Sequence, residues 1–232
     1  MNLSRFYRVS AIVLLAQVAL AAYGVWAAGP DTQVPVHWGV DGQPDGWSTA
    51  LVGFSLMPLI TAGIVALFAA IPRIEPRRRN LERSASAYRT TATAVVVFLG
   101  VAQGVVVFAS LGGSLPMNVI VGLGVGLLFV VMGNVMATVR SNFMFGVRTP
   151  WTLTSDLSWD RTNRLVGRLF VIAGLTLIVL TFTGNAELIV WVMVGWIAVI
   201  LVGGFWYSYR VWASDPNRRQ RLGDGPEPGS AP

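Results

Sequence analysis

One polar segment lies between two long apolar runs and carries many of the side chains that could do chemistry. It reads NFMFGVRTPWTLTSDLSWDRTNRLVGR, residues 142–168, and combines arginines, threonines, tryptophans and acids. Such a segment could be an ordinary loop, a catalytic site or a docking surface. The residue types in the rest of the sequence distinguish these three alternatives.

Catalysis has little support from the residue types. A nucleophilic enzyme needs a nucleophile beside a base, and a metalloenzyme needs a set of ligands. The chain has no cysteine and a single histidine, His37. With Asp41 and Asp45, His37 could form a loose metal site, but a surface or turn-stabilising histidine is the better interpretation. The sequence predicts no enzyme, no catalytic residue, no metal site and no cofactor.

The apolar runs predict an all-α integral membrane protein. The mean hydropathy is +0.61 and only 12% of residues are charged. A bilayer core of about 30 Å needs roughly 20 apolar residues per helix. Six stretches meet this length, at residues 9–28, 51–71, 91–111, 118–139, 165–182 and 188–207. Arg5 and Arg8 with Ala27 and Ala28 also suit a cleaved signal, but the first run is longer than a signal core, so we expect a retained helix.

The arginines predict the orientation. The chain has no lysine, and all 17 arginines fall in segments on the side of the two termini: residues 1–8, 73–89, 140–168 and 210–221. Basic residues stay in cytoplasmic loops, so we expect both termini on the cytoplasmic side of the membrane. A pI near 10.7 therefore indicates anionic lipid headgroups rather than direct contact with nucleic acid.

Polar and small residues within the spans predict how the helices pack. Gly104 and the Gly122–Gly126 pair fall at matching depth in the third and fourth spans, so these helices are expected to touch there. No ionisable residue lies in the middle of a span, which argues against a proton-coupled transporter. Gln103 and Asn134 are predicted to hydrogen-bond between helices, with the lining of a transport path as the alternative.

A short turn-rich loop at residues 29–50 joins the first two spans outside the membrane. VPVHW reads as an extended piece, and Asp41-Gly42 and Asp45-Gly46 are turn signals. Trp38 and Trp47 suit the membrane interface.

The polar segment is predicted to begin a helix that continues into the fifth span. Pro150 forces Thr149 to be extended, and Thr154 or Ser155 can cap the helix. The spacing of Asp156, Asp160, Arg164 and Arg168 favours a salt-bridged stripe, and Trp151 and Trp159 suit the headgroup layer. On these grounds alone the segment is an interfacial anchor.

The motifs add a resemblance. Gly133-Asn134, RSNFMFGVRTPWTL, Trp159 and TNRLVGRLFV together resemble the signature of the SdpI-like family of bacterial membrane proteins, and VPVHWGVDGQPDGW resembles the small outer-loop domain that often accompanies it. Family members commonly have a histidine where this chain has Asn163. The outer-loop domain often ends with a lysine, which is absent here at Ser48 and Thr49.

The resemblance implies immunity and signalling: resistance to a secreted antimicrobial peptide outside, and a cytoplasmic transcriptional repressor held at the membrane. The implied partner-binding residues are Asn134, Asn142, Arg148, Thr149, Pro150, Trp151, Thr152, Trp159 and Arg164, with His37, Trp38, Asp41 and Asp45 as outer-loop candidates. The alternative is a transporter of a small or lipid-like molecule.

The expected organisation has four parts. These are a first hairpin with the outer-loop domain (1–72), a basic cytoplasmic loop that anchors to lipids (73–90), an SdpI-like four-helix region with a cytoplasmic loop at 140–164 (91–208), and a disordered cytoplasmic tail (209–232).

Overall fold

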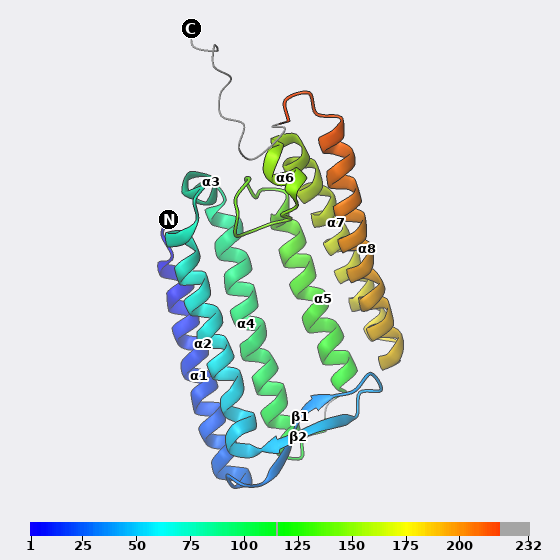
Figure 1. The fold of residues 1–232 in the computed structure, drawn as a ribbon. Helices are drawn as coiled ribbons and strands as arrows, with labels where there is room; N and C mark the ends of the chain where they lie inside the picture. The colour runs from blue at the N-terminus through cyan, green and yellow to red at the C-terminus, as the bar shows by residue number, and fades with distance from the viewer. Residues whose placement is uncertain (115, 219–232) are drawn as a thin grey trace.

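The computed structural model describes residues 1–114 and 116–218, and its main elements are six long helices (Figure 1). They are α1 (Ser4–Ala28), α2 (Ala50–Ile74), α4 (Ala85–Ser110), α5 (Met117–Met136), α7 (Asp156–Thr181) and α8 (Ala186–Ala213). All six are long and apolar enough to cross a membrane. Two short helices, α3 (Arg78–Arg83) and α6 (Pro150–Thr154), lie in the connections. The predicted six-span membrane architecture is therefore confirmed.

The helices form two groups. Helices α1, α2 and α4 pack together, α5, α7 and α8 pack together, and the contact between α4 and α5 joins the groups. The most extensive contact in the molecule is between α5 and α7. The molecule is therefore two bundles side by side, with a thinner seam along α4 and α5.

The loop after α1 is a β-hairpin of β1 (Gln33–Trp38) and β2 (Pro44–Thr49). The antiparallel register pairs Gln33 with Thr49 and Trp38 with Pro44. Val34 is buried against Phe54 and Val107 at the ends of α2 and α4. The sequence predicted the first extended piece but not the second strand, because proline and glycine disfavour strands and packing against the helix ends overrides that preference.

Glycines bring α5 and α7 into backbone contact. A Cβ on Gly174 would lie 2.4 Å from the carbonyl oxygen of Gly126, and a Cβ on Gly133 would lie 2.5 Å from that of Gly167. Gly126 and Gly133 are seven residues apart on α5, and Gly167 and Gly174 are seven residues apart on α7, which keeps each two on one face of their helix. Helices α4 and α5 touch, as predicted, but not at the predicted glycines, because a Cβ on Gly104 would meet nothing within 4 Å. The glycine face of α5 is turned toward α7 instead.

Amide side chains connect the helices of the first bundle. Gln103 Nε2 donates to the carbonyl oxygens of Phe54 (3.0 Å) and Gln17 (3.3 Å), and Gln17 Nε2 donates to that of Leu99 (3.1 Å). The prediction of an interhelical partner is confirmed for Gln103. It is wrong for Asn134, whose side chain is exposed, because α5 buries the neighbouring Gly133 face against α7.

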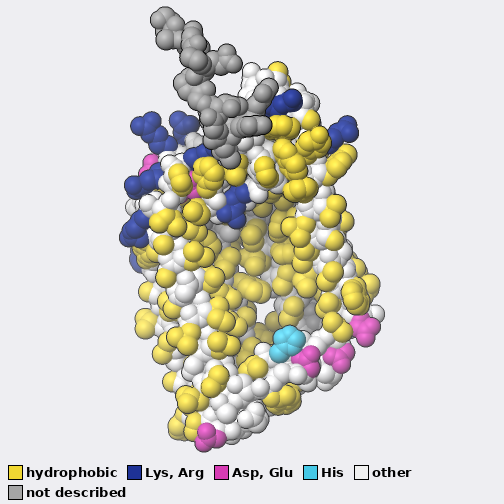
Figure 2. Space-filling view, viewed as in Figure 1, with side chains coloured by type: hydrophobic (Ala, Val, Ile, Leu, Met, Phe, Trp, Pro, Cys, Tyr) yellow, Lys and Arg dark blue, Asp and Glu magenta, His cyan; other side chains and the backbone are white. Residues whose placement is uncertain are grey.

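The charged side chains divide between the two ends of the molecule (Figure 2). On the visible face, arginines gather at the end where α1 begins, and His37 and several acids lie at the hairpin end. We call these the arginine end and the hairpin end. Helix α8 continues to Ala213, so the first residues assigned to the tail, 209–213, are helical. Arg219, Arg221 and the rest of the predicted disordered tail, 219–232, lie outside the described residues.

Candidate functional site

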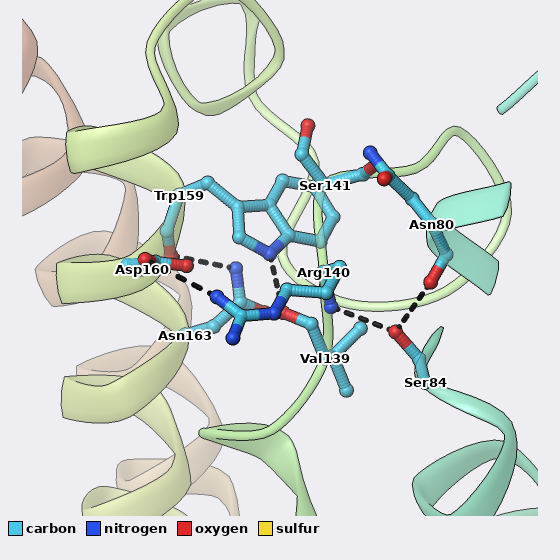
Figure 3. Close-up of polar contacts among 8 residues, drawn as sticks. All are labelled: Asn80, Ser84, Val139, Arg140, Ser141, Trp159, Asp160 and Asn163. Atoms are coloured by element: carbon cyan, nitrogen blue, oxygen red, sulfur yellow. Dashed lines mark hydrogen bonds and ion pairs between the residues drawn. The ribbon is translucent and has the colours of Figure 1, made fainter. Parts of the chain in front are cut away.

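The polar segment folds into a layer at the arginine end (Figure 1), and Figure 3 shows some of its polar contacts. We call it the arginine-end layer and define it as residues 75–84, 139–163 and 208–215. In the close-up, the loop after α5 lies between α7 on one side and residues 80–84 on the other. The Ser84 hydroxyl accepts from the Arg140 N–H and donates to the Asn80 carbonyl, both at 2.8 Å. The layer therefore joins the two bundles.

Asn142 organises the first turn of the loop. Its side chain is fully buried. Oδ1 accepts from the N–H groups of Met144 (2.9 Å) and Phe145 (2.7 Å), while Nδ2 donates to the carbonyls of Arg140 (2.8 Å) and Phe145 (2.9 Å). These four bonds satisfy the amide. In this structure Asn142 holds the loop rather than facing a partner.

Trp159 and Asn163 fix the loop to α7. Trp159 is fully buried, and its Nε1 donates to the Val139 carbonyl at 2.7 Å. Asn163 Nδ2 donates to the Trp159 carbonyl (3.0 Å), and its Oδ1 accepts from the Val147 N–H (2.9 Å). The predicted headgroup position of Trp159 is wrong, because helical periodicity puts it on the buried face of α7 with Ser155, Thr162 and Asn163.

Gly146 lies against the same two side chains. Its φ of +112° favours glycine. A Cβ there would lie 2.9 Å from Asn163 Oδ1 and 3.0 Å from the Trp159 ring. The glycine of the GVRTPW motif therefore permits both the turn and the close approach of the loop to α7.

The threonines of the motif connect α6 to α8. Thr149 is extended, with φ −114° and ψ 163°, as the following proline predicted. Thr149 Oγ1 accepts from the Thr152 N–H at 3.1 Å and lies 3.0 Å from the Ser208 hydroxyl of α8. Thr152 Oγ1 donates to the Val147 carbonyl at 2.9 Å. Both threonines are buried, so their contacts are structural.

Trp151 also contacts α8. Its ring packs edge-on against Phe205 and Tyr209, with centroid distances of 4.6 and 5.2 Å. The side chain is half-buried. This packing fixes the orientation of α6 relative to α8.

Ser155 ties the start of α7 to the end of α8. It is the N-cap of α7, as predicted, and accepts from the Ser158 N–H at 2.9 Å. The Ser155 hydroxyl donates to Asp215 Oδ2 at 2.5 Å, and the Asn217 N–H donates to Oδ1 at 2.9 Å. The hydrogen bond from Ser155, followed by that from Asn217, holds the pKa of Asp215 below its usual value.

The predicted salt-bridged stripe along α7 does not form among the described residues. Asp160 pairs instead with Arg140 from the loop, at 3.8 Å. Arg164 and Arg168 are exposed. The four-residue spacing of Asp160 and Arg164 suited an ion pair within α7, but the fold brings Arg140 beside Asp160 instead.

The first basic loop contributes side chains that the sequence analysis missed. Glu75 is buried, and its Oε1 accepts from the N–H groups of Arg77 (2.8 Å) and Phe143 (3.1 Å). Arg77 donates to the Ser141 hydroxyl and to the Leu153 carbonyl (3.0 Å), and its guanidinium lies 4.7 Å from the Phe143 ring centroid. This loop, predicted as a lipid anchor, thus also binds the second loop. The available signal was the position of Glu75 just before the run of arginines at residues 77–79, with only Pro76 between them.

Some predicted residues remain accessible on the layer. Arg148 and Pro150 are exposed, and Arg148 Nη1 donates to the Phe143 carbonyl at 2.7 Å. Arg164 is exposed, and its spacing from Arg161 and Arg168 puts all three on one face of α7. A separate cavity of about 440 Å³ in the same layer is lined by residues that include Arg77, Asn80, Ser155, Asp156 and Asp215.

The outer-loop candidates lie at the opposite end of the molecule. His37 Nδ1 is 2.5 Å from Asp45 Oδ1, and both side chains are largely exposed. Asp41 Oδ1 accepts from the Gln43 N–H at 3.0 Å and so shapes the turn. Trp38 is half-buried. Within the described ranges, 1–114 and 116–218, no three His, Cys, Asp or Glu side chains are grouped so that they could hold a metal.

These features define a six-helix membrane protein with a small hairpin at one end and a buried polar layer at the other. Residues 138–208 match the SdpI/YfhL protein family, and residues 12–62 match a domain of unknown function, DUF1648. Over these two segments the chain resembles SdpI-like proteins that carry a DUF1648 domain.

A curated relative supports this assignment. The immunity protein SdpI of Bacillus subtilis (strain 168) is 31% identical over 118 residues, which are 51% of this chain and 56% of that protein. The match thus spans little more than half the length of the relative. No solved structure matches the chain.

Proposed function

We propose that this chain is an immunity-type protein of the bacterial plasma membrane that protects the cell from a secreted antimicrobial peptide. The observation that carries the proposal is the arginine-end layer. Its central loop, α6 and α7 fall within the segment that matches the SdpI/YfhL family, and a curated relative is named an immunity protein. With the arginine end in the cytoplasm, the hairpin end meets the peptide.

A second part of the proposal concerns signalling. The layer presents Arg148 and Pro150 on a loop whose other polar side chains are held by hydrogen bonds. A loop that is already ordered loses little entropy on binding. We propose that this surface binds an acidic face of a cytoplasmic transcriptional repressor, with Arg161 and Arg164 adding positive charge. The repressor, and not this chain, would contact DNA.

The immunity part is tested by killing curves. A strain that lacks the gene should be more sensitive to a membrane-active secreted peptide, and expression of the chain should restore survival. The panel should include peptides secreted by related strains. Unchanged survival of the deletion strain across such a panel would contradict the proposal.

The signalling part is tested by capture of cytoplasmic partners with Arg148→Glu. Charge reversal at an exposed position should abolish capture of one DNA-binding protein while membrane abundance stays unchanged. Arg78→Glu, an equally exposed change on α3, is the matched control and should retain capture. Trp151→Ala is not a useful probe of the surface, because it removes packing between α6 and α8. Equal capture by both charge variants would refute the signalling part alone.

The transporter alternative has weaker support. Gln103 uses its amide N–H groups on backbone carbonyls of neighbouring helices, and Asn134 is exposed on α5. These two side chains therefore do not line a common path.

A further inference from the structure

A groove lies at the arginine end, away from the loops of the arginine-end layer. Its volume is about 450 Å³, and it is formed by the first turns of α1, the first turns of α4 and the last part of α5. Arg5 and Arg89 line it together with Thr93, Val9, Val97 and Val131. The groove therefore has both cationic and apolar walls.

The two guanidinium groups have spare donors. Arg5 is exposed, and within the described part of the chain no carboxylate lies within ion-pair distance of Arg5 or Arg89. Arg89 Nη1 donates to the Asn2 carbonyl at 3.1 Å, which leaves further N–H groups on that side chain. Glu82, on neighbouring α3, pairs with the amino group of Met1 at 3.7 Å. The groove is thus lined by cations without a local counterion.

The polarity of the groove changes along the helix axis. Arg89, Thr93 and Val97 follow one another at four-residue spacing on α4, so they share a face and descend by about 6 Å per step. On α1, Arg5 is likewise followed by Val9. The groups of a phospholipid follow the same order, from a charged phosphate through a polar glycerol ester region to an apolar chain.

The groove also lies on the seam between the two bundles. Val131 belongs to α5, whereas the other lining residues named here belong to α1 and α4. The contact between α4 and α5 is less extensive than that between α5 and α7. An acyl chain along this seam would add apolar contacts between the bundles.

We propose that this groove binds one anionic phospholipid. The phosphate lies between Arg5 and Arg89, and an acyl chain lies along Val97 and Val131. Charge complementarity selects an anionic over a zwitterionic lipid. This inference does not depend on the proposed immunity function.

The first test measures lipids retained by the full chain in detergent, by native mass spectrometry, after addition of phosphatidylglycerol or phosphatidylcholine. We expect one tightly retained phosphatidylglycerol. The double variant Arg5→Gln, Arg89→Gln should retain it about 30-fold more weakly, since each arginine near a headgroup contributes roughly fivefold. Arg78→Gln, Arg79→Gln removes the same charge from exposed positions on α3 and should behave as the unaltered chain. Equal retention in both double variants, or of both lipids, would overturn the proposal.

The second test fills the apolar part of the groove without changing charge. Val97→Trp should displace the lipid, while Leu15→Trp, at a site on α1 that is 72% exposed, should not. Competition with inorganic phosphate distinguishes a lipid from a free anion. If millimolar phosphate displaces phosphatidylglycerol, or if Val97→Trp retains the lipid fully, the groove is an anion site and the proposed lipid site is wrong.

Discussion

Asn163 joins α7 to the motif loop through Oδ1, which accepts from the Val147 N–H, while Nδ2 donates to the Trp159 carbonyl within α7. We expect Asn163→Leu to lower the free energy of unfolding by about 1–3 kcal/mol, because the partly buried Val147 N–H would lose its acceptor. Thermal unfolding of the purified protein in detergent measures this. Arg164→Gln, one residue further along the helix and exposed, is the control and should change little. If Asn163→Leu lowered the stability no more than Arg164→Gln does, the Asn163 amide would not stabilise the contact between α7 and the loop.

Asp215 makes the link between α7 and α8 dependent on pH. Its pKa is lowered in the folded protein by the Ser155 and Asn217 hydrogen bonds. The stabilisation is therefore fully present above the ordinary aspartate pKa of about 3.9 and is lost as the pH falls through the lowered value. We expect Asp215→Asn to be less stable than the unaltered chain at pH 6. The difference in the free energy of unfolding should become small below pH 4.

The control for this pH dependence is Asp31→Asn, which alters an exposed acid at the hairpin end. Asp31→Asn should be as stable as the unaltered chain both at pH 6 and below pH 4. A difference between Asp215→Asn and the unaltered chain that stayed constant from pH 6 to pH 3 would rule out the titration of Asp215 as its source.

Local rules predicted some residues of the site and not others. Thr149 and Ser155 could be assigned because a following proline and an N-cap act within a few residues. Trp159 could not, because its burial depends on a loop that folds back from α5. Arg77 was assigned to lipid for the same reason, since its partners Ser141 and Leu153 are more than 60 residues away.

Helices α5 and α7 depend on glycine where their backbones meet. We expect Gly174→Ala to destabilise the protein by about 1–3 kcal/mol, because the added methyl group would overlap the Gly126 carbonyl and separate the helices. Gly104→Ala, in α4, has open space and should be neutral or slightly stabilising. Urea or thermal unfolding of the two variants gives the comparison. Equal stability of the two variants would show that the close contact is not required.

The six spans could be predicted because lipid imposes length and hydropathy on each helix separately. The faces by which the helices meet could not be predicted, because glycines occur on several spans and only the assembled bundle decides which of them are in contact. Gly122, Gly126 and Gly133 of α5 thus face α7, and Gly104 has no such contact. The second strand of the hairpin was missed for a related reason, since its pairing with β1 outweighs the poor strand propensity of Pro44 and Gly46.

The orientation of the whole molecule can be measured with single cysteines, because the chain contains none. Gln43→Cys lies in the hairpin turn and Thr138→Cys in the loop after α5, and both positions are exposed. We expect a membrane-impermeant maleimide to label Gln43→Cys in intact cells and Thr138→Cys only after permeabilisation. Neither substitution removes an arginine, so the signal that sets the topology is unchanged. The reverse labelling pattern would invert the proposed sidedness.

The separation of charge into two end faces has an electrical consequence. Carrying one elementary charge across a potential of 100 mV involves about 2.3 kcal/mol of work, yet the middle of every span is free of ionisable groups. Any rearrangement that keeps both charged faces at their own surfaces transfers no charge through the field. Such a rearrangement would therefore neither respond to the membrane voltage nor draw energy from it.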